Sequence, residues 1–576
     1  MLKIALVGLA LILVGAFLGH EVQTAGGSIQ IKDVRWQTAD GDTLSALLYV
    51  PESASPATPA PGILAVHGYI NTRETQSGFA IEFARRGFVV LALDQAGHGY
   101  SSPPAFANGF GGPAGLEYLR GLSVVDPTRI GLEGHSMGGW TVLMAAAAYP
   151  DGYEAMVLEG SSTGTFGTPA GTPEFPRNLK LVFSLYDEFS GFMWDAPIPA
   201  DIVSTPKLKQ LFGTSETIVA GKLYGSFEQG SARELAMPAV THPGDHLSTE
   251  AIGAAVDWFQ RTLLPPSPRP QLEQAWYLKE YGTLLMLLGL TLLVLPLFEL
   301  LAKQKVFQSA TTEPVAAANI PTIWRKVAMF STVVIPVLLF FPLQTIANLV
   351  LPASSLLPQQ ITNGVVLWAW GSGLVAVTVM WFSLRQRVVT LASLGLPVKL
   401  RVVASALLLA LAVVGVLYLI VLATQEWLLL DYRFWVVALK SMSSDQIKIF
   451  IVYLPFFATF FLALSAATHL PDQRHLSVRR EAARNALMLS VGFVFLLLAQ
   501  YLPLFLGGSL LVASQPLLTI VALQFVPLLA LIAIISTCCF RRTHNIYTGA
   551  FINTLLVTWY MVAGTATQAL PFWSSM

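Results

Sequence analysis

The chain has 576 residues, of which 54% are hydrophobic and only 12% charged, and its formal net charge is zero. Soluble domains carry about 25% charged residues, so this chain is not an ordinary soluble protein throughout. The balanced charge, with no basic patch, argues against a nucleic-acid partner. Residues 20–280 have the composition of a globular domain, whereas residues 281–576 form a succession of long apolar runs.

The N-terminus begins with Met1-Leu2-Lys3, followed by an uncharged run from Ile4 to Gly19. This length fits a secretory signal or a short signal anchor. Because no small-x-small cleavage motif follows, residues 1–19 are predicted to remain as an N-terminal transmembrane anchor. In either case the segment that follows is exported.

Residues 20–270 are predicted to form one extracytoplasmic domain in which strands alternate with helices. The first two strands, 29–38 and 43–50, alternate in polarity and form a hairpin, and the later strands are short and apolar. The remaining expected strands are 62–67, 88–94, 130–135, 153–160 and 179–186, with helices at 78–87, 112–123, 140–148 and 249–263. Alternating strands and helices predict a mainly parallel sheet with flanking helices.

The most informative motif of this domain is Gly134-His135-Ser136-Met137-Gly138, which lies between an expected strand and an expected helix. A Gly-x-Ser-x-Gly in that context is a nucleophile elbow, a sharp turn that exposes the serine hydroxyl above the sheet. The motif therefore marks Ser136 as a candidate nucleophile.

Two other segments, His67-Gly68-Tyr69 and Asp94 to Gly99, carry a family resemblance together with Asp126 to Gly139, the stretch that contains this motif. With them the chain resembles the α/β-hydrolase fold family, in particular its dienelactone-hydrolase and acetyl-esterase types, over about residues 29–264. The resemblance implies an α/β-hydrolase domain and a serine hydrolase with a Ser-Asp-His triad.

In that family the acid and the histidine follow the serine in chain order. The resemblance places the acid at Asp187, with Glu188 as the alternative. It places the base at His246, just before the last helix, with His242 as the alternative. The backbone N–H groups of Tyr69 and Met137 would form the oxyanion hole. No cofactor or metal ion is expected.

The segment between Asp187 and His246 is about twice as long as in a plain family member. An insertion at about 190–232, with a helix over Pro206–Tyr224, is predicted to form a cap over the pocket. Its apolar side chains either receive an acyl chain or pack the helices of the cap itself. A second open segment, Ser161–Pro176, is predicted to line the entrance.

Residues 271–576 are predicted to form an all-α membrane domain, since they contain about eight apolar runs of spanning length. These runs are 281–301, 327–350, 364–384, 402–424, 449–470, 486–506, 514–537 and 547–570. Lys and Arg gather in every other connection, which predicts that the N-terminus is cytoplasmic and residues 20–270 lie outside the cell membrane. No Asn-x-Ser/Thr sequon occurs, which fits a bacterial protein.

Together these features predict a membrane-embedded serine hydrolase, carboxylesterase-like or lipase-like, that cleaves a small-molecule or lipid acyl ester through an acyl-serine intermediate. The protein is expected to lie in the lipid bilayer. Two alternatives stay open at this point. One is an acyltransferase that uses the same triad, and the other is a transporter or sensor in which the hydrolase-like domain only binds a ligand.

Overall fold

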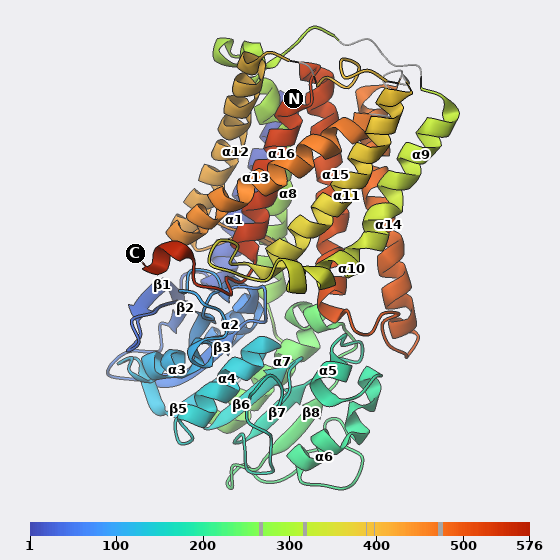
Figure 1. The fold of residues 1–576 in the computed structure, drawn as a ribbon. Coiled ribbons are helices and arrows are strands. Elements are labelled where there is room, and N and C mark those ends of the chain that lie inside the picture. The colour runs from blue at the N-terminus through green and yellow to red at the C-terminus, as the bar shows by residue number, and fades with distance from the viewer. Residues whose placement is uncertain (264–268, 315–319, 387–388, 397, 470–475, 576) are drawn as a thin grey trace.

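The computed structural model describes residues 1–263, 269–314, 320–386, 389–396, 398–469 and 476–575. An α/β part with a large sheet lies at one end and a bundle of long helices at the other (Figure 1). The N-terminus lies at the far end of the bundle, and the C-terminus lies where the bundle meets the α/β part (Figure 1).

The large sheet has eight strands in the order β1-β2-β4-β3-β5-β6-β7-β8. Strand β2 is antiparallel to β1 and β4, and all later pairs are parallel. This confirms the mostly parallel sheet of an α/β-hydrolase domain. The strands are β1 Ile29–Gln37, β2 Thr43–Pro51, β3 Ala60–Val66, β4 Val89–Asp94, β5 Val125–His135, β6 Ala155–Glu159, β7 Leu179–Val182 and β8 Arg233–Ala236.

Helices cover both faces of this sheet, and its central strands are therefore buried along their whole length. On one face, α3 (Gly112–Arg120) and α4 (Met137–Ala148) contribute to a core that includes Leu64, Leu91 and Leu132. On the other face, α2 (Ser77–Ala84) and α7 (Thr249–Leu263) pack on Ile63, Val90 and Val157. The sheet is therefore fixed between two apolar layers.

The segment between β7 and β8 holds α5 (Ser190–Trp194) and α6 (Pro206–Phe212). The expected helix over Pro206–Tyr224 is much shorter, because Gly213 adopts a left-handed φ of 65° and ends it. This segment lies at the edge of the α/β part beside β8 (Figure 1).

Within the described ranges, eight helical segments are long and apolar enough to cross a membrane. They are α1 (Leu2–Gln23), α8 (Trp276–Leu301), α9 with α10 (Thr322–Val333 and Ile335–Val350), α11 (Gln360–Arg385), α12 (Leu400–Leu428), α13 (Ser444–His469), α14 (Val478–Phe505) and α15 (Pro516–Thr543). The expected run at 547–570 forms α16 (Tyr547–Gly564), which is not among the eight. Most of its side chains are buried by neighbouring helices, so α16 tolerates more polar residues than a helix facing lipid.

The N-terminal helix α1 packs closely on α8 through facing glycines. A Cβ atom on Gly8 would lie 2.9 Å from the carbonyl oxygen of Gly289, and one on Gly15 would collide with that of Gly282. Small residues at such a contact let two helix backbones approach each other. Helix α1 is thus an integral member of the bundle.

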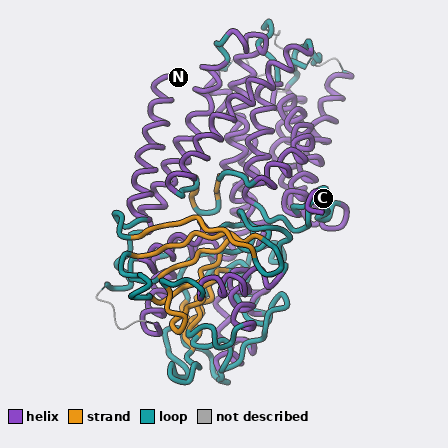
Figure 2. The backbone as a smooth tube through the Cα atoms, turned by 90° about the vertical axis from the view of Figure 1, so that its left-hand side faces the viewer, coloured by secondary structure: helices purple, strands orange, loops and turns teal. Residues whose placement is uncertain are grey.

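A short hairpin, β9 (Tyr432–Phe434) and β10 (Val437–Leu439), lies between the bundle and the sheet (Figure 2). It carries Arg433 and Lys440 toward the loop that follows β3. Arg433 donates hydrogen bonds to Thr72 and Thr75, and Lys440 pairs with Glu74 at 3.0 Å. Burial disfavours charge on Glu74, but Lys440 and Arg73 outweigh it and hold the pKa of Glu74 well below its usual range. The two parts of the chain therefore meet through a buried ion pair and buried hydrogen bonds.

Candidate active site

Ser136 lies in the sharp turn between β5 and α4 with φ 56° and ψ −120°, a conformation that non-glycine residues rarely adopt. The glycines of the motif explain why this turn is possible. A Cβ on Gly138 would collide with the carbonyl oxygen of Val66, and one on Gly134 with the backbone of Gly138. The turn between a strand and a helix, with its strained serine, has the geometry that a nucleophile elbow requires.

Asp187 follows β7, and its carboxylate accepts a hydrogen bond from the ring of His242. The distance from His242 Nδ1 to Asp187 Oδ2 is 2.9 Å. The backbone N–H of Phe189 donates to the other carboxylate oxygen at 2.8 Å. Gly160 makes room for the pair, because a Cβ there would lie 2.8 Å from His242 Nδ1. Since Nδ1 is held by the acid, any bond from this ring to a nucleophile would have to come from Nε2.

The sequence favours His246 as the base, but the structure places the alternative, His242, beside Asp187. Both histidines belong to one short 3-10 helix, His242–Leu247. Neither ring nitrogen of His246 has a hydrogen-bond partner among the described residues, and its ring packs against Phe79 and His135. His135 bonds through Nε2 to the carbonyl oxygen of His242 at 3.0 Å, which helps to hold that turn in place.

Burial works against charge on both members of the Asp187–His242 pair. It lowers the pKa of His242 well below the usual value, with a further contribution from His135. It raises the pKa of Asp187, together with the nearby carboxylate of Asp245. The hydrogen bond between them offsets part of this cost, and at neutral pH the imidazole is uncharged and able to accept a proton.

Glu188, the alternative acid, has a different position from Asp187. Its Oε2 accepts the backbone N–H of His242 at 2.7 Å, and its Oε1 accepts the hydroxyl of Tyr501 on α14 at 2.7 Å. Burial and the Asp187 carboxylate raise the pKa of Glu188 to about 8. Glu188 therefore supports the backbone of the histidine rather than its ring.

The two predicted oxyanion donors, Tyr69 and Met137, both border the cavity that contains Ser136. In the described part of the chain, neither backbone N–H donates to another protein group. Gly68 brings the loop close to the nucleophile, since a Cβ on it would lie 3.1 Å from the Cβ of Ser136. The Tyr69 hydroxyl accepts a hydrogen bond of 2.6 Å from Gln568, near the C-terminus.

The cavity at Ser136, hereafter the catalytic cavity, has a volume of about 370 Å³. Ser136, His242 and His246 border it, and one wall is aromatic and contains Phe106, Trp140, Phe166, Phe189 and Phe192. Phe192 belongs to the predicted cap segment and Phe166 to the segment Ser161–Pro176, and both border this cavity. Among the described residues, no group of three or more His, Cys, Asp or Glu is placed to hold a metal ion.

The opposite wall of the catalytic cavity comes from the helical part, which the sequence did not predict. It consists of Val436, Leu517, Ile520, Gln524 and Gln568. These residues follow Ser136 by hundreds of positions and match no motif, so only the folded chain reveals them. The bundle is therefore part of the site.

Residues 61–271 match a family model described as the alpha/beta hydrolase fold. A monoacylglycerol lipase of Mycolicibacterium smegmatis is 36% identical over 118 residues, which are 18% of this chain and 40% of the lipase. An uncharacterised protein of Mycobacterium tuberculosis is 34% identical over 105 residues, 17% of this chain and 28% of the relative. The chain thus spans less than half the length of these curated relatives.

Among solved structures, an esterase of Pyrococcus furiosus is similar at 16% identity and a TM-score of 0.29, covering 42% of this chain and 95% of the esterase. A dienelactone hydrolase of Anabaena variabilis is similar at 19% identity and a TM-score of 0.28, covering 41% of this chain and 99% of the hydrolase. The family match and the strand order give the α/β part the α/β-hydrolase fold.

Proposed function

We propose that this protein is a membrane-embedded serine esterase in which Ser136 is the nucleophile, His242 the general base and Asp187 the residue that orients His242. The observation that carries the proposal is the Asp187–His242 hydrogen bond in a cavity that Ser136 borders from a strained elbow. A nucleophile, a base and an orienting carboxylate are what acyl transfer from an ester requires.

In the proposed reaction the Ser136 hydroxyl oxygen attacks the ester carbonyl while His242 Nε2 takes its proton. The N–H groups of Tyr69 and Met137 stabilise the negative charge that develops on the carbonyl oxygen, each contributing about 3 kcal/mol. The carbon–oxygen bond to the alcohol then breaks, and His242 returns the proton to the leaving alkoxide. Water, deprotonated by the same nitrogen, then attacks the acyl carbon. The bond to the Ser136 oxygen breaks, His242 returns the proton to that oxygen, and the acid is released.

We propose that residues 1–19 and 271–576 lie in a membrane and that residues 20–270 lie on its outer side. The N- and C-termini are at opposite ends of the bundle, so α16 crosses it as a ninth helix (Figure 1). Basic residues gather where α8, α11 and α15 end and where α9, α12 and α14 begin, the end of the bundle that holds the N-terminus. Clustered Lys and Arg mark the cytoplasmic side.

The proposal is tested by labelling the detergent-solubilised protein with a fluorophosphonate probe, which reacts with activated serines. We expect labelling of the wild type, none of Ser136→Ala, and a large decrease in His242→Ala. His246→Ala is the matched control, because this histidine borders the same cavity without contacting Asp187, and it is expected to label. A folded wild type that stays unlabelled, or a His246→Ala variant that alone loses labelling, would contradict the assignment.

A further inference from the structure

Three cavities adjoin one another between Ser136 and the interior of the helical bundle. The catalytic cavity shares Ile70, Asn71, Val436 and Gln524 with a second cavity, hereafter the middle cavity. The middle cavity shares Gln524, Leu528 and Tyr560 with a third, hereafter the side cavity. Gln524 borders all three. Three neighbouring cavities therefore lie in sequence from Ser136 to the interior of the bundle, and the middle one is the smallest, at about 40 Å³.

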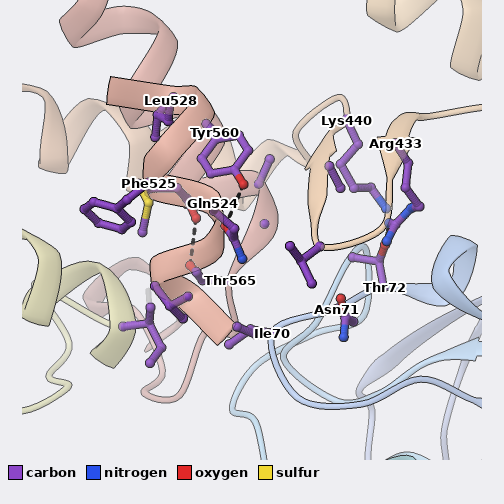
Figure 3. Close-up of a pocket in the computed structure, with 17 residues that line it drawn as sticks. Ile70, Asn71, Thr72, Arg433, Lys440, Gln524, Phe525, Leu528, Tyr560 and Thr565 are labelled. Carbon is purple, nitrogen blue, oxygen red and sulfur yellow. Dashed lines mark hydrogen bonds between the residues drawn. The ribbon is translucent and has the colours of Figure 1, made fainter. Parts of the chain in front are cut away.

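The middle cavity lies between the loop at Ile70–Thr72, the hairpin with Arg433 and Lys440, and helices α15 and α16 (Figure 3). The hydroxyl of Tyr560 donates a hydrogen bond of 2.6 Å to Oε1 of Gln524. The nitrogen of Gln524 points away from Tyr560 toward the centre of the pocket (Figure 3). The side-chain nitrogen of Gln524 is therefore a hydrogen-bond donor for a polar group in the middle cavity, which lies between the catalytic cavity and the more apolar side cavity.

The side cavity has a volume of about 240 Å³ and lies among α8, α12, α15 and α16. Apart from Thr291, Gln524 and Tyr560 its lining is apolar, and the Thr291 hydroxyl is already bonded to the carbonyl oxygen of Leu287. An apolar cavity of this kind binds hydrocarbon and excludes water. Leu287, Leu531 and Leu556, which are partly buried, also line it.

The side cavity opens on the flank of the bundle. Leu288 of α8 borders it and is 47% exposed, and Pro527 of α15 borders it and is exposed as well. From Leu517 at the catalytic cavity to Pro527 at the opening, α15 advances about 15 Å. Half of a bilayer's hydrocarbon core is about 15 Å thick, so a lipid chain beside the bundle reaches the depth of this opening.

From this arrangement we infer that the substrate is a long-chain lipid ester that enters from the bilayer through the flank between α8 and α15. Its acyl chain lies in the side cavity, its polar ester end passes Gln524, and its carbonyl carbon reaches Ser136. This inference rests on the proposed esterase function and names the substrate class of that site. It also assigns the bundle a direct role, because the bundle supplies the chain-binding part of the site.

The aromatic wall of the catalytic cavity is the competing place for the chain. Phe166 and Phe192 both contact Trp140 there, and both are exposed on the α/β side. A substrate arriving from water would place its apolar group against this wall. The two routes predict different chain contacts, which makes them separable.

The first test fills the side cavity with Leu531→Trp and, separately, Leu556→Trp, and compares hydrolysis of p-nitrophenyl palmitate and p-nitrophenyl acetate by the full-length protein. We expect kcat/KM for palmitate to fall by about tenfold or more, as when about two methylene groups lose their burial, with acetate hydrolysis and fluorophosphonate labelling unchanged. Leu419→Trp is the matched control, because Leu419 is 62% exposed on the flank of α12. An unchanged ratio of palmitate to acetate hydrolysis in both filled variants would overturn the inference.

The second test is independent of catalysis and uses the Ser136→Ala protein in nanodiscs with a palmitoyl ester that carries a diazirine at the chain end. Crosslinks on α8, α15 or α16 around the side cavity support the inference, and crosslinks on Phe166 or Phe192 overturn it. If the wild type does not react with fluorophosphonate but the crosslinks map to the side cavity, the chain site stands and the esterase function fails. If the serine reacts but the crosslinks map to the aromatic wall, the opposite holds.

Discussion

Tyr501 and Glu188 are 313 positions apart in the chain, yet the hydroxyl of one donates a 2.7 Å hydrogen bond to the carboxylate of the other. Glu188 in turn accepts the backbone N–H of His242. A helix of the bundle is thereby linked through one carboxylate to the backbone of the proposed base. The position of His242 depends on the docking of the two parts of the chain.

Tyr501→Phe is expected to destabilise the protein and to lower its esterase activity. The variant removes the hydroxyl that donates to Glu188 and leaves a buried carboxyl oxygen of Glu188 unpaired, which costs about 1–3 kcal/mol. We expect a lower Tm in detergent and a lower kcat for a short-chain ester, with little change in KM. Tyr281→Phe is the control, since Tyr281 is 53% exposed on α8. Equal Tm and kcat in the two variants would contradict this role for Tyr501.

The pH dependence of stability is expected to reflect Glu188. In the folded protein its pKa is raised to about 8 by burial and by the Asp187 carboxylate, against an ordinary value of 4.5. Between these two pH values the folded state binds more protons at Glu188 than the unfolded state does. The contribution of Glu188 to the free energy of unfolding is therefore greatest below about pH 4.5 and is lost as the pH rises through about 8.

At about 1.4 kcal/mol per pH unit, this single group accounts for several kcal/mol at most. Glu188→Gln removes the titration and is expected to flatten the fall in Tm between pH 5 and pH 9. Thermal unfolding of wild type and variant across that range is the measurement. If the two curves keep the same slope, another group is responsible.

Asp187→Asn is expected to lower kcat by about 10⁴-fold, the scale seen when the carboxylate of a serine protease triad is replaced by an amide. The amide cannot fix the ring tautomer of His242 or stabilise its protonated form. Glu188→Gln is the control at the neighbouring position, and we expect it to retain most of its activity at neutral pH. Steady-state hydrolysis of p-nitrophenyl butyrate distinguishes the two. Equal losses would show that the acid role is not specific to Asp187.

Gly138→Ala is expected to disrupt the elbow, because its Cβ would collide with the backbone carbonyl oxygen of Val66. Overpacking of this kind costs about 1–3 kcal/mol or more, and it moves the turn that presents Ser136. We expect both a lower Tm and loss of fluorophosphonate labelling. Gly191→Ala serves as the control, since the nearest atom to its Cβ would lie 3.9 Å away. Normal labelling of Gly138→Ala would show that the turn tolerates a side chain.

The elbow could be predicted from the sequence because its chemistry is local. The glycines around Ser136 and the strand and helix beside them lie within a few positions, and each has a steric reason to be there. The position of Asp187 after β7 could also be predicted, from the resemblance to the family. The sequence could not decide between His242 and His246, because both lie on one short 3-10 helix. His242 meets the acid beside Gly160, where a side chain would leave no room for its ring.

The wall that the bundle contributes had no signal in the sequence. Gln524, Leu517 and Gln568 look like ordinary residues of apolar helices and their connections. Their position depends on how α15 and the C-terminal segment dock on the α/β part, which is fixed by pairs such as Lys440 with Glu74. Hydropathy likewise predicted a run of spanning length at 547–570, but it did not indicate that neighbouring helices bury most of α16.

The division of the catalytic cavity between residues before 250 and residues after 430 also limits how this gene can change. Recombination that attached the first half to another set of spanning helices would remove Gln524 and Gln568 from beside Ser136 and Tyr69. A protease that cut between the halves and let them separate would leave the nucleophile facing water instead of a shaped pocket. The shape of this cavity therefore exists only while the two halves stay docked as one unit.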